Sequence, residues 1–130
     1  MKIITFALLS FVTLAFLPGC SNSTDPDNGG NNGGGEKSFR QNVLPILNAN
    51  GCSGCHGGNG GLTVTSVGAL LTGGDHGPAI VPGNADSSNL VRKLLSPPPF
   101  GSRMPLGGGA LSDASVGVIR TWINEGAKDN

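Results

Sequence analysis

Two cysteines followed directly by a histidine form the feature that most restricts how this chain can fold. Cys52 and Cys55 flank Ser53 and Gly54, and His56 comes next. Cys-x-x-Cys-His is the attachment motif of c-type haem. The thiols add to the two porphyrin vinyl groups, and the histidine becomes the proximal ligand of the iron. The motif therefore predicts a protein built around one covalently bound haem c and its iron.

Three other roles for the two cysteines are open to a chain of this kind. A structural zinc site needs four ligands, and the one other histidine, His76, has no suitable spacing from His56. A thioredoxin-like redox pair is expected between a strand and a helix, whereas the flanks here are rich in glycine. A disulfide between Cys52 and Cys55 would leave His56 without a role. Haem attachment is the interpretation that uses all three residues.

The start of the chain has the pattern of an export signal. Lys2 precedes an uncharged apolar run from Ile3 to Leu17, which is short for a membrane span and typical of a signal peptide. The run ends in Leu17-Pro18-Gly19-Cys20, which resembles a bacterial lipobox. We expect residues 1–19 to be a lipoprotein signal peptide and Cys20 to carry the lipid. The alternative is an ordinary secretory signal in which Cys20 is incidental.

If Cys20 takes lipid and Cys52 and Cys55 take haem, no cysteine is left for a disulfide framework, because the chain has 3 in all. We expect the exported protein to lie at the periplasmic or outer-surface face of a bacterial membrane. Its lipid would anchor it there.

Residues 20–37 form a second region, dominated by Gly, Asn, Ser and acidic residues. Such a segment buries too little apolar surface to offset the entropy of ordering it. It predicts a flexible tether with a root-mean-square reach of about 20–25 Å.

The remaining residues, 38–130, predict one small domain with an unusually poor core of its own. Its aromatic residues are Phe39, Phe100 and Trp122. A domain of this size with so few large apolar side chains is marginally stable, and a buried haem would supply apolar surface. The chain carries 8 Lys+Arg and 8 Asp+Glu, so its charge gives no sign of nucleic acid as a partner.

Four segments have the apolar spacing and capping residues of short helices, and none is convincing as a strand. The expected fold is all-α, with about four short helices wrapped around the haem. The predicted helices are about 38–48 (cap Ser38), 66–72 (cap Thr65 or Ser66), 87–95 (cap Asp86) and 113–125 (cap Ser112). Pro45 is expected to interrupt or kink the first, and Trp122 in the last is expected to pack near Phe39.

A loop from Gly101 to Leu106 contains Met104, the only methionine left once the signal peptide has gone. A lone methionine is more often core filler than a ligand, but this one lies in a Pro/Gly loop and Pro105 restricts the adjacent backbone. A thioether ligand to iron raises the potential. The other candidate for the sixth ligand is His76, which alternatively lies at the haem edge or hydrogen-bonds a propionate. Residues 80–83 are expected to be extended, turn at Pro-Gly and line the haem pocket.

Four stretches together carry a family resemblance. CSGCHG at 52–57, the segment 60–90, RMPLGGGALSD at 103–113 and VIRTWINEGA at 118–127 resemble the mono-haem cytochrome c domain of class I, closest to the planctomycete type. The resemblance covers nearly all of 39–127. It implies that Cys52 and Cys55 hold the haem, that His56 is the proximal ligand and that Met104 is the distal ligand. It also implies an all-α fold in which the first and last helices cross.

The expected function is one-electron transfer through a single haem with both axial positions filled, to redox partner proteins of an electron-transfer chain. The protein is then a carrier and not an enzyme. The alternative is a small haem enzyme or gas sensor, similar to a peroxidase, with a displaceable sixth ligand. The glycine-rich stretches near residues 57–61 and 107–109 lack the Gly-Lys-Ser/Thr ending of a phosphate-binding loop.

Overall fold

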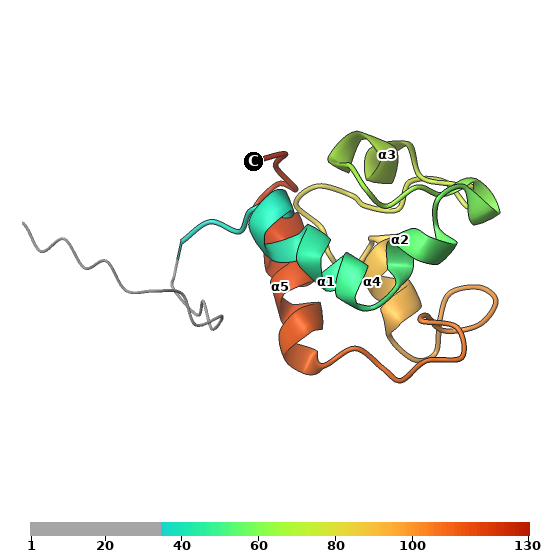
Figure 1. Cartoon of the computed structure of the whole chain (residues 1–130). Coiled ribbons are helices and arrows are strands. Elements are labelled where there is room, and N and C mark those ends of the chain that lie inside the picture. Colours follow the sequence, from blue (N-terminus) through green and yellow to red (C-terminus); the bar gives the residue numbers. More distant parts are fainter. Residues whose placement is uncertain (1–34) are drawn as a thin grey trace, which may run out of the picture. The chain divides into compact units, whose positions relative to one another are not determined.

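Short helices joined by long irregular segments make up the part of the chain that the structure describes (Figure 1). The computed structural model describes residues 35–130, so the predicted signal peptide, Cys20 and most of the tether lie outside the described residues. The elements in order are η1 (Phe39–Val43), α1 (Leu44–Ala49), α2 (Cys52–Cys55), η2 (Asn59–Gly61), α3 (Val67–Thr72), α4 (Asn89–Leu94) and α5 (Asp113–Asn124).

The all-α prediction is confirmed for the described residues. Between residues 35 and 130, β pairing is limited to two isolated bridges, Gly57 with Thr63 and Gly74 with Gly77. No helix in this same part of the chain is both long enough and apolar enough to cross a membrane.

The first predicted helix is present but begins with an unusual turn. Ser38 caps it as predicted, its hydroxyl accepting from the amide of Gln41 at 3.2 Å. η1 is a π-helical turn and runs directly into α1, where Pro45 lies in the first turn. A proline inside a helix lacks an amide hydrogen and clashes with the preceding turn. The wider turn just before Pro45 is how this helix accommodates it.

The caps of two other helices are also as predicted. The hydroxyl of Ser66 accepts from the amide of Ala69 at 3.2 Å and begins α3. The hydroxyl of Ser112 accepts from the amide of Ser115 at 3.1 Å and begins α5. Each bond satisfies one amide that the first helical turn leaves without a partner. Gly73, with φ +76°, follows the end of α3.

The predicted start of the third helix is wrong. α4 begins at Asn89, after Ser88, because residues 84–88 form a separate turn. The hydroxyl of the buried Ser88 donates to the carbonyl of Asn84 and accepts from the amide of Val81, both at 2.8 Å. Asp86, the predicted cap, instead pairs with Arg120 of α5 at 2.5 Å.

η1 and α5 pack together and form one part of the core. Phe39 and Trp122 are buried, and their ring centroids lie 5.3 Å apart, as the sequence predicted. The other buried side chains of these two helices are Val43, Val116, Ile119 and Ile123. Tilted aromatic pairs at this separation add stabilisation beyond their burial. This contact is the crossing of the first and last helices.

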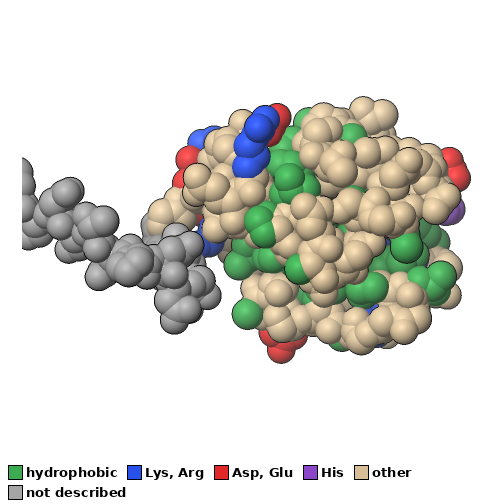
Figure 2. All heavy atoms as spheres, viewed as in Figure 1, with side chains coloured by type: hydrophobic (Ala, Val, Ile, Leu, Met, Phe, Trp, Pro, Cys, Tyr) green, Lys and Arg blue, Asp and Glu red, His purple; other side chains and the backbone are tan. Residues whose placement is uncertain are grey.

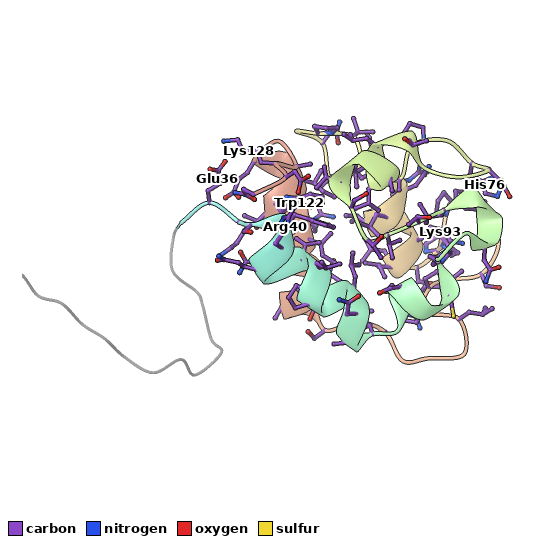
Figure 3. All side chains as sticks on the ribbon, turned by 45° about the horizontal axis from the view of Figure 1, so that its top comes forward. Glu36, Arg40, His76, Lys93, Trp122 and Lys128 are labelled. Atoms are coloured by element: carbon purple, nitrogen blue, oxygen red, sulfur yellow. The ribbon has the colours of Figure 1, made fainter. Side chains whose placement is uncertain are left out.

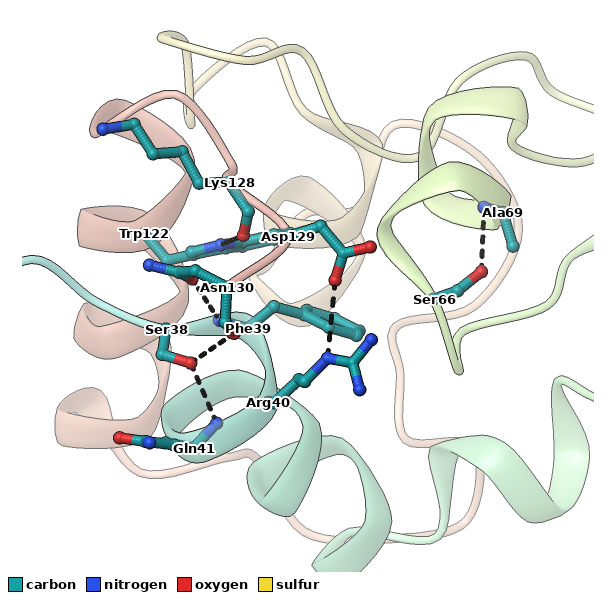
Figure 4. Close-up of polar contacts among 10 residues, drawn as sticks. All are labelled: Ser38, Phe39, Arg40, Gln41, Ser66, Ala69, Trp122, Lys128, Asp129 and Asn130. Atoms are coloured by element: carbon teal, nitrogen blue, oxygen red, sulfur yellow. Dashed lines mark hydrogen bonds and ion pairs between the residues drawn. The ribbon is translucent and has the colours of Figure 1, made fainter.

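The last residues of the chain fold back over the start of η1 (Figures 3 and 4). The backbone carbonyl of Asn130 accepts from the hydroxyl of Ser38 at 2.6 Å and from the amide of Arg40 at 3.3 Å. The indole of Trp122 donates to the carbonyl of Lys128 at 3.0 Å. Lys128 also pairs with Glu36. Charged side chains of both signs gather on this part of the surface (Figure 2).

Candidate cofactor site

A cavity of about 320 Å³ opens on the surface of the domain. Figure 3 shows His76 and Lys93, two of its lining residues, well apart from Glu36, Arg40 and Lys128. Its volume falls in the range of small-molecule and cofactor sites. The lining is mainly apolar, and its principal residues are Cys52, His56, Leu62, Val64, His76, Ala79, Leu90, Lys93, Leu94, Phe100 and Met104.

The motif cysteines lie on a short helix that the sequence analysis did not predict. α2 follows α1 closely because Gly51, with φ +71°, adopts the left-handed conformation that lets the chain turn. Cys52 is half-buried at the cavity, whereas Cys55 is exposed. Burial raises the pKa of the Cys52 thiol. α2 could not be predicted from the sequence, because its four residues are too few to show the apolar spacing of a helix.

His56 is held with one ring nitrogen engaged. Its Nδ1 lies 3.2 Å from the backbone carbonyl oxygen of Asn59. Because a carbonyl oxygen can only accept a hydrogen bond, Nδ1 carries the proton in the neutral ring, and the lone pair of Nε2 can bind a metal. The side-chain amide of Asn59 in turn donates to the carbonyl of Cys55 at 2.8 Å. A second hydrogen bond of this kind fixes the orientation and tautomer of metal-ligating histidines. Asn59 is a functional residue that the sequence analysis missed.

Both candidates for the sixth ligand line the cavity. Met104 is half-buried and packs against the core, and its amide donates to the carbonyl of Lys93 at 2.8 Å. His76 is exposed, and its ring stacks on that of Phe100 with centroids 3.9 Å apart and an interplanar angle of 26°. The structure thus brings Cys52, His56, Met104 and His76 to one cavity.

The prediction that residues 80–83 line the pocket is wrong. The lining includes Ala79 and none of the next four residues. Ile80 is buried in the core, and the amide of Gly83 donates to the carbonyl of Ile123 in α5 at 2.7 Å. The predicted turn is present, since Gly83 has φ +78°. The segment therefore joins α5 rather than the cavity.

Lys93 is the cavity residue that an inspection of the sequence most easily overlooks. It follows Leu90 by three positions, so it lies on the same side of α4 as the apolar residues. Its ammonium donates to the carbonyls of Phe100 at 2.6 Å and Ser102 at 2.5 Å. The position of this lysine among the apolar residues of a helix was the sequence feature that could have indicated its role.

These residues fit a large apolar cofactor that carries anionic groups. The walls are apolar, a thiol and an oriented imidazole face the cavity, and Lys93 contributes a positive charge. Arg103, next to Met104, has a buried Nη1 without a partner among the described residues. A buried guanidinium donor of this kind is matched by a carboxylate, and haem carries two propionates.

Two observations concern the zinc and disulfide alternatives for the cysteine pair. Between residues 35 and 130 no three His, Cys, Asp or Glu side chains come together where they could hold a metal ion, as a zinc site requires. Cys52 and Cys55 are not joined by a disulfide in the structure.

Residues 52–105 match the family model described as Planctomycete cytochrome C. The matched segment begins at the first motif cysteine and ends just after Met104, so it contains every residue singled out above at the cavity. No curated protein and no solved structure matches the chain.

Proposed function

Because residues 52–105 match the family model of planctomycete cytochrome c, we propose that this protein is a one-electron carrier with a single haem c. Cys52 and Cys55 would hold the haem through thioether bonds, His56 would be the proximal ligand of the iron and Met104 the distal ligand. Bound haem supplies an iron that exchanges one electron between its ferric and ferrous states.

The observation that carries the proposal is that Cys52, His56 and Met104 line one cavity although Met104 is far from the other two in sequence. The Asn59 carbonyl keeps Nδ1 of His56 engaged, which leaves Nε2 free to bind a metal. Met104 packs against the core, whereas His76 is exposed. Burial excludes water from a thioether ligand, so Met104 is the better candidate for the second axial position.

The chain's own residues would also govern access to the cofactor. Leu62, Val64 and Leu94 form apolar walls, which exclude water and favour the less charged ferrous state. Exposed residues such as Asp75 and Ser102 form the rim. We propose that redox partner proteins approach at this rim and that the electron passes without any bond being made or broken.

Purified mature protein tests the proposal. We expect the haem to remain with the polypeptide through acid-acetone extraction, the mass to exceed that of the peptide by one haem, and reversible one-electron titration. Extraction of the haem would contradict covalent attachment. Fast, tight binding of carbon monoxide by the reduced protein would instead support the haem enzyme or gas sensor.

We further propose that the domain is a membrane-anchored lipoprotein, with residues 1–19 as its signal peptide and Cys20 as the lipidated residue. The support is the lipobox-like sequence and the polar residues 21–37 that follow. Cys20→Ser is expected to release the domain from the membrane or to leave an unprocessed precursor. Wild-type protein found unlipidated in the soluble fraction would contradict the anchor.

A further inference from the structure

The loop that carries Met104 lacks backbone hydrogen bonds over most of its length. Residues 96–103, in the described part of the chain, neither donate nor accept a backbone–backbone hydrogen bond. They include Pro97, Pro98 and Pro99, which have no amide hydrogen to donate. The loop must therefore be held by side chains if Met104 is to stay at the cavity.

Lys93 supplies most of that restraint. Its ammonium donates to the carbonyls of Phe100 at 2.6 Å and Ser102 at 2.5 Å, and lies 4.6 Å from the centroid of the Phe100 ring. Its own carbonyl accepts from the amide of Met104 at 2.8 Å. One residue of α4 thus holds the loop at three places, the last of them at Met104 itself.

The loop that carries His76 is fixed to the same helix. The side chain of Asn89 donates to the carbonyls of His76 and Pro78, each at 3.2 Å. The His76 ring stacks on Phe100, which lies beside the Lys93 ammonium. The His76 ring therefore has a structural partner in Phe100, and α4 holds both the loop that carries His76 and the loop that carries Met104.

We propose that Lys93 is a positioning residue that holds Met104 in place for the iron. The inference rests on the proposed function, in which Met104 is the sixth ligand. Hydrogen bonds from an ammonium to a carbonyl are stronger than those between neutral groups. Their loss would free residues 100–102 to move, and Met104 would then compete less well with ligands from solution.

The test uses the full haem-loaded chain and imidazole as the competing ligand. Lys93→Met keeps an unbranched apolar side chain that is one atom shorter and removes the ammonium donors. Arg92→Met is the matched control, because Arg92 is the neighbouring exposed cation on α4. Imidazole is titrated against the ferric protein while the near-infrared sulfur-to-iron band is followed. We expect Lys93→Met to bind imidazole about tenfold more tightly than wild type, and Arg92→Met to stay within about twofold.

Lys93→Arg keeps the charge and the donors and is expected to restore most of the wild-type resistance to imidazole. If Lys93→Met does not retain haem, Lys93→Gln replaces it, and an intermediate gain in imidazole affinity is expected. Wild-type affinity in Lys93→Met, or in Lys93→Gln where that variant is used, would overturn the proposal.

The result also separates this inference from the proposed function. If wild-type ferric protein lacks the sulfur-to-iron band, Met104 is not the ligand, and the positioning role fails with it. If the band is present in wild type and absent in Met104→Ala, but Lys93→Met behaves as wild type, only the role of Lys93 is wrong.

Discussion

The side of the domain formed by η1 and α5 is packed around the aromatic pair Phe39–Trp122, whereas the side formed by α4 and the loops around it lines the larger cavity. Trp122 and Phe39 lie against each other at the first. At the second, apolar residues such as Leu62 and Leu94 face a space of about 320 Å³. Apolar walls around an open space lack the contacts that stabilise a close-packed interior.

The difference between the two sides suggests where a short domain with few aromatic residues obtains its stability. The η1–α5 side is stabilised by contacts within the chain itself. The hydrogen bonds of Asn130 with Ser38 and Arg40 join the residues after α5 to the start of η1. The cavity side holds every residue predicted to bind the haem except the exposed Cys55. We infer that the haem takes the place of a second core.

Removal of the haem is expected to have the largest effect. The double change Cys52→Ala and Cys55→Ala should yield a largely unfolded protein, and any remaining structure should be at the η1–α5 side. Amide hydrogen exchange in residues 60–104 should be faster than in the haem-loaded protein by at least about tenfold, with a smaller change in α5. A haem-free protein with the same cooperative thermal transition as the loaded one would contradict this.

Trp122→Ala tests the other side. Trp122 is 0 % exposed, and its replacement should lower the free energy of unfolding by about 3–5 kcal/mol because a cavity is created. Denaturant unfolding measures the loss, and the haem spectrum of the molecules that remain folded should be unchanged. Leu106→Ala is the control, since Leu106 is 72 % exposed and should change stability by less than about 0.5 kcal/mol. Equal losses in the two variants would show that the η1–α5 contact is not a core.

The two sides also differ in how far they could be predicted. The caps Ser38, Ser66 and Ser112 and the Phe39–Trp122 contact follow from local patterns and apolar periodicity, and the structure confirms them. Such signals lie within one turn of a helix or repeat along it.

The cavity side depends on contacts that no local pattern encodes. The hydrogen bond between His56 and the Asn59 carbonyl forms where the chain turns from α2 into η2. The ammonium of Lys93 in α4 bonds to the irregular loop that follows this helix. The predicted start of α4 was wrong for a similar reason. The buried Ser88 hydroxyl forms hydrogen bonds with the preceding segment, at Val81 and Asn84, and the helix begins only after it. On this side the sequence identified the motif residues Cys52 and His56 and the two candidate ligands Met104 and His76, but not the contacts that hold them.

Loss of a helix cap should have a moderate effect on the η1–α5 side. Ser112→Ala removes the acceptor for the Ser115 amide and should cost about 1 kcal/mol of stability. Thermal unfolding of the haem-loaded protein measures it. Ser87→Ala is the comparison, because Ser87 is exposed and its recorded bond uses its backbone amide. If both changes lower the unfolding temperature equally, the Ser112 cap contributes nothing specific.

The smallest effect on stability is expected from replacing Lys128, which pairs with Glu36. Glu36 raises the pKa of Lys128 above its usual value, chiefly by accepting its hydrogen bond. A cation with a raised pKa adds stability that is present below its unfolded pKa and is lost as pH rises through the folded one. Lys128→Met should therefore unfold at a slightly lower temperature than wild type near neutral pH, and the difference should disappear as the pH rises through the pKa of Lys128. A difference that grows at alkaline pH would contradict the pairing.

The near-infrared sulfur-to-iron band of the ferric protein tests the central claim most directly, because it reports whether the cavity is completed by haem bound to Met104. We predict that the band is present in wild type, absent in Met104→Ala and unchanged in His76→Ala. Met104→Ala should also have a lower reduction potential and should bind added ligands readily. Absence of the band in wild type, or its loss in His76→Ala while Met104→Ala retains it, would contradict the account.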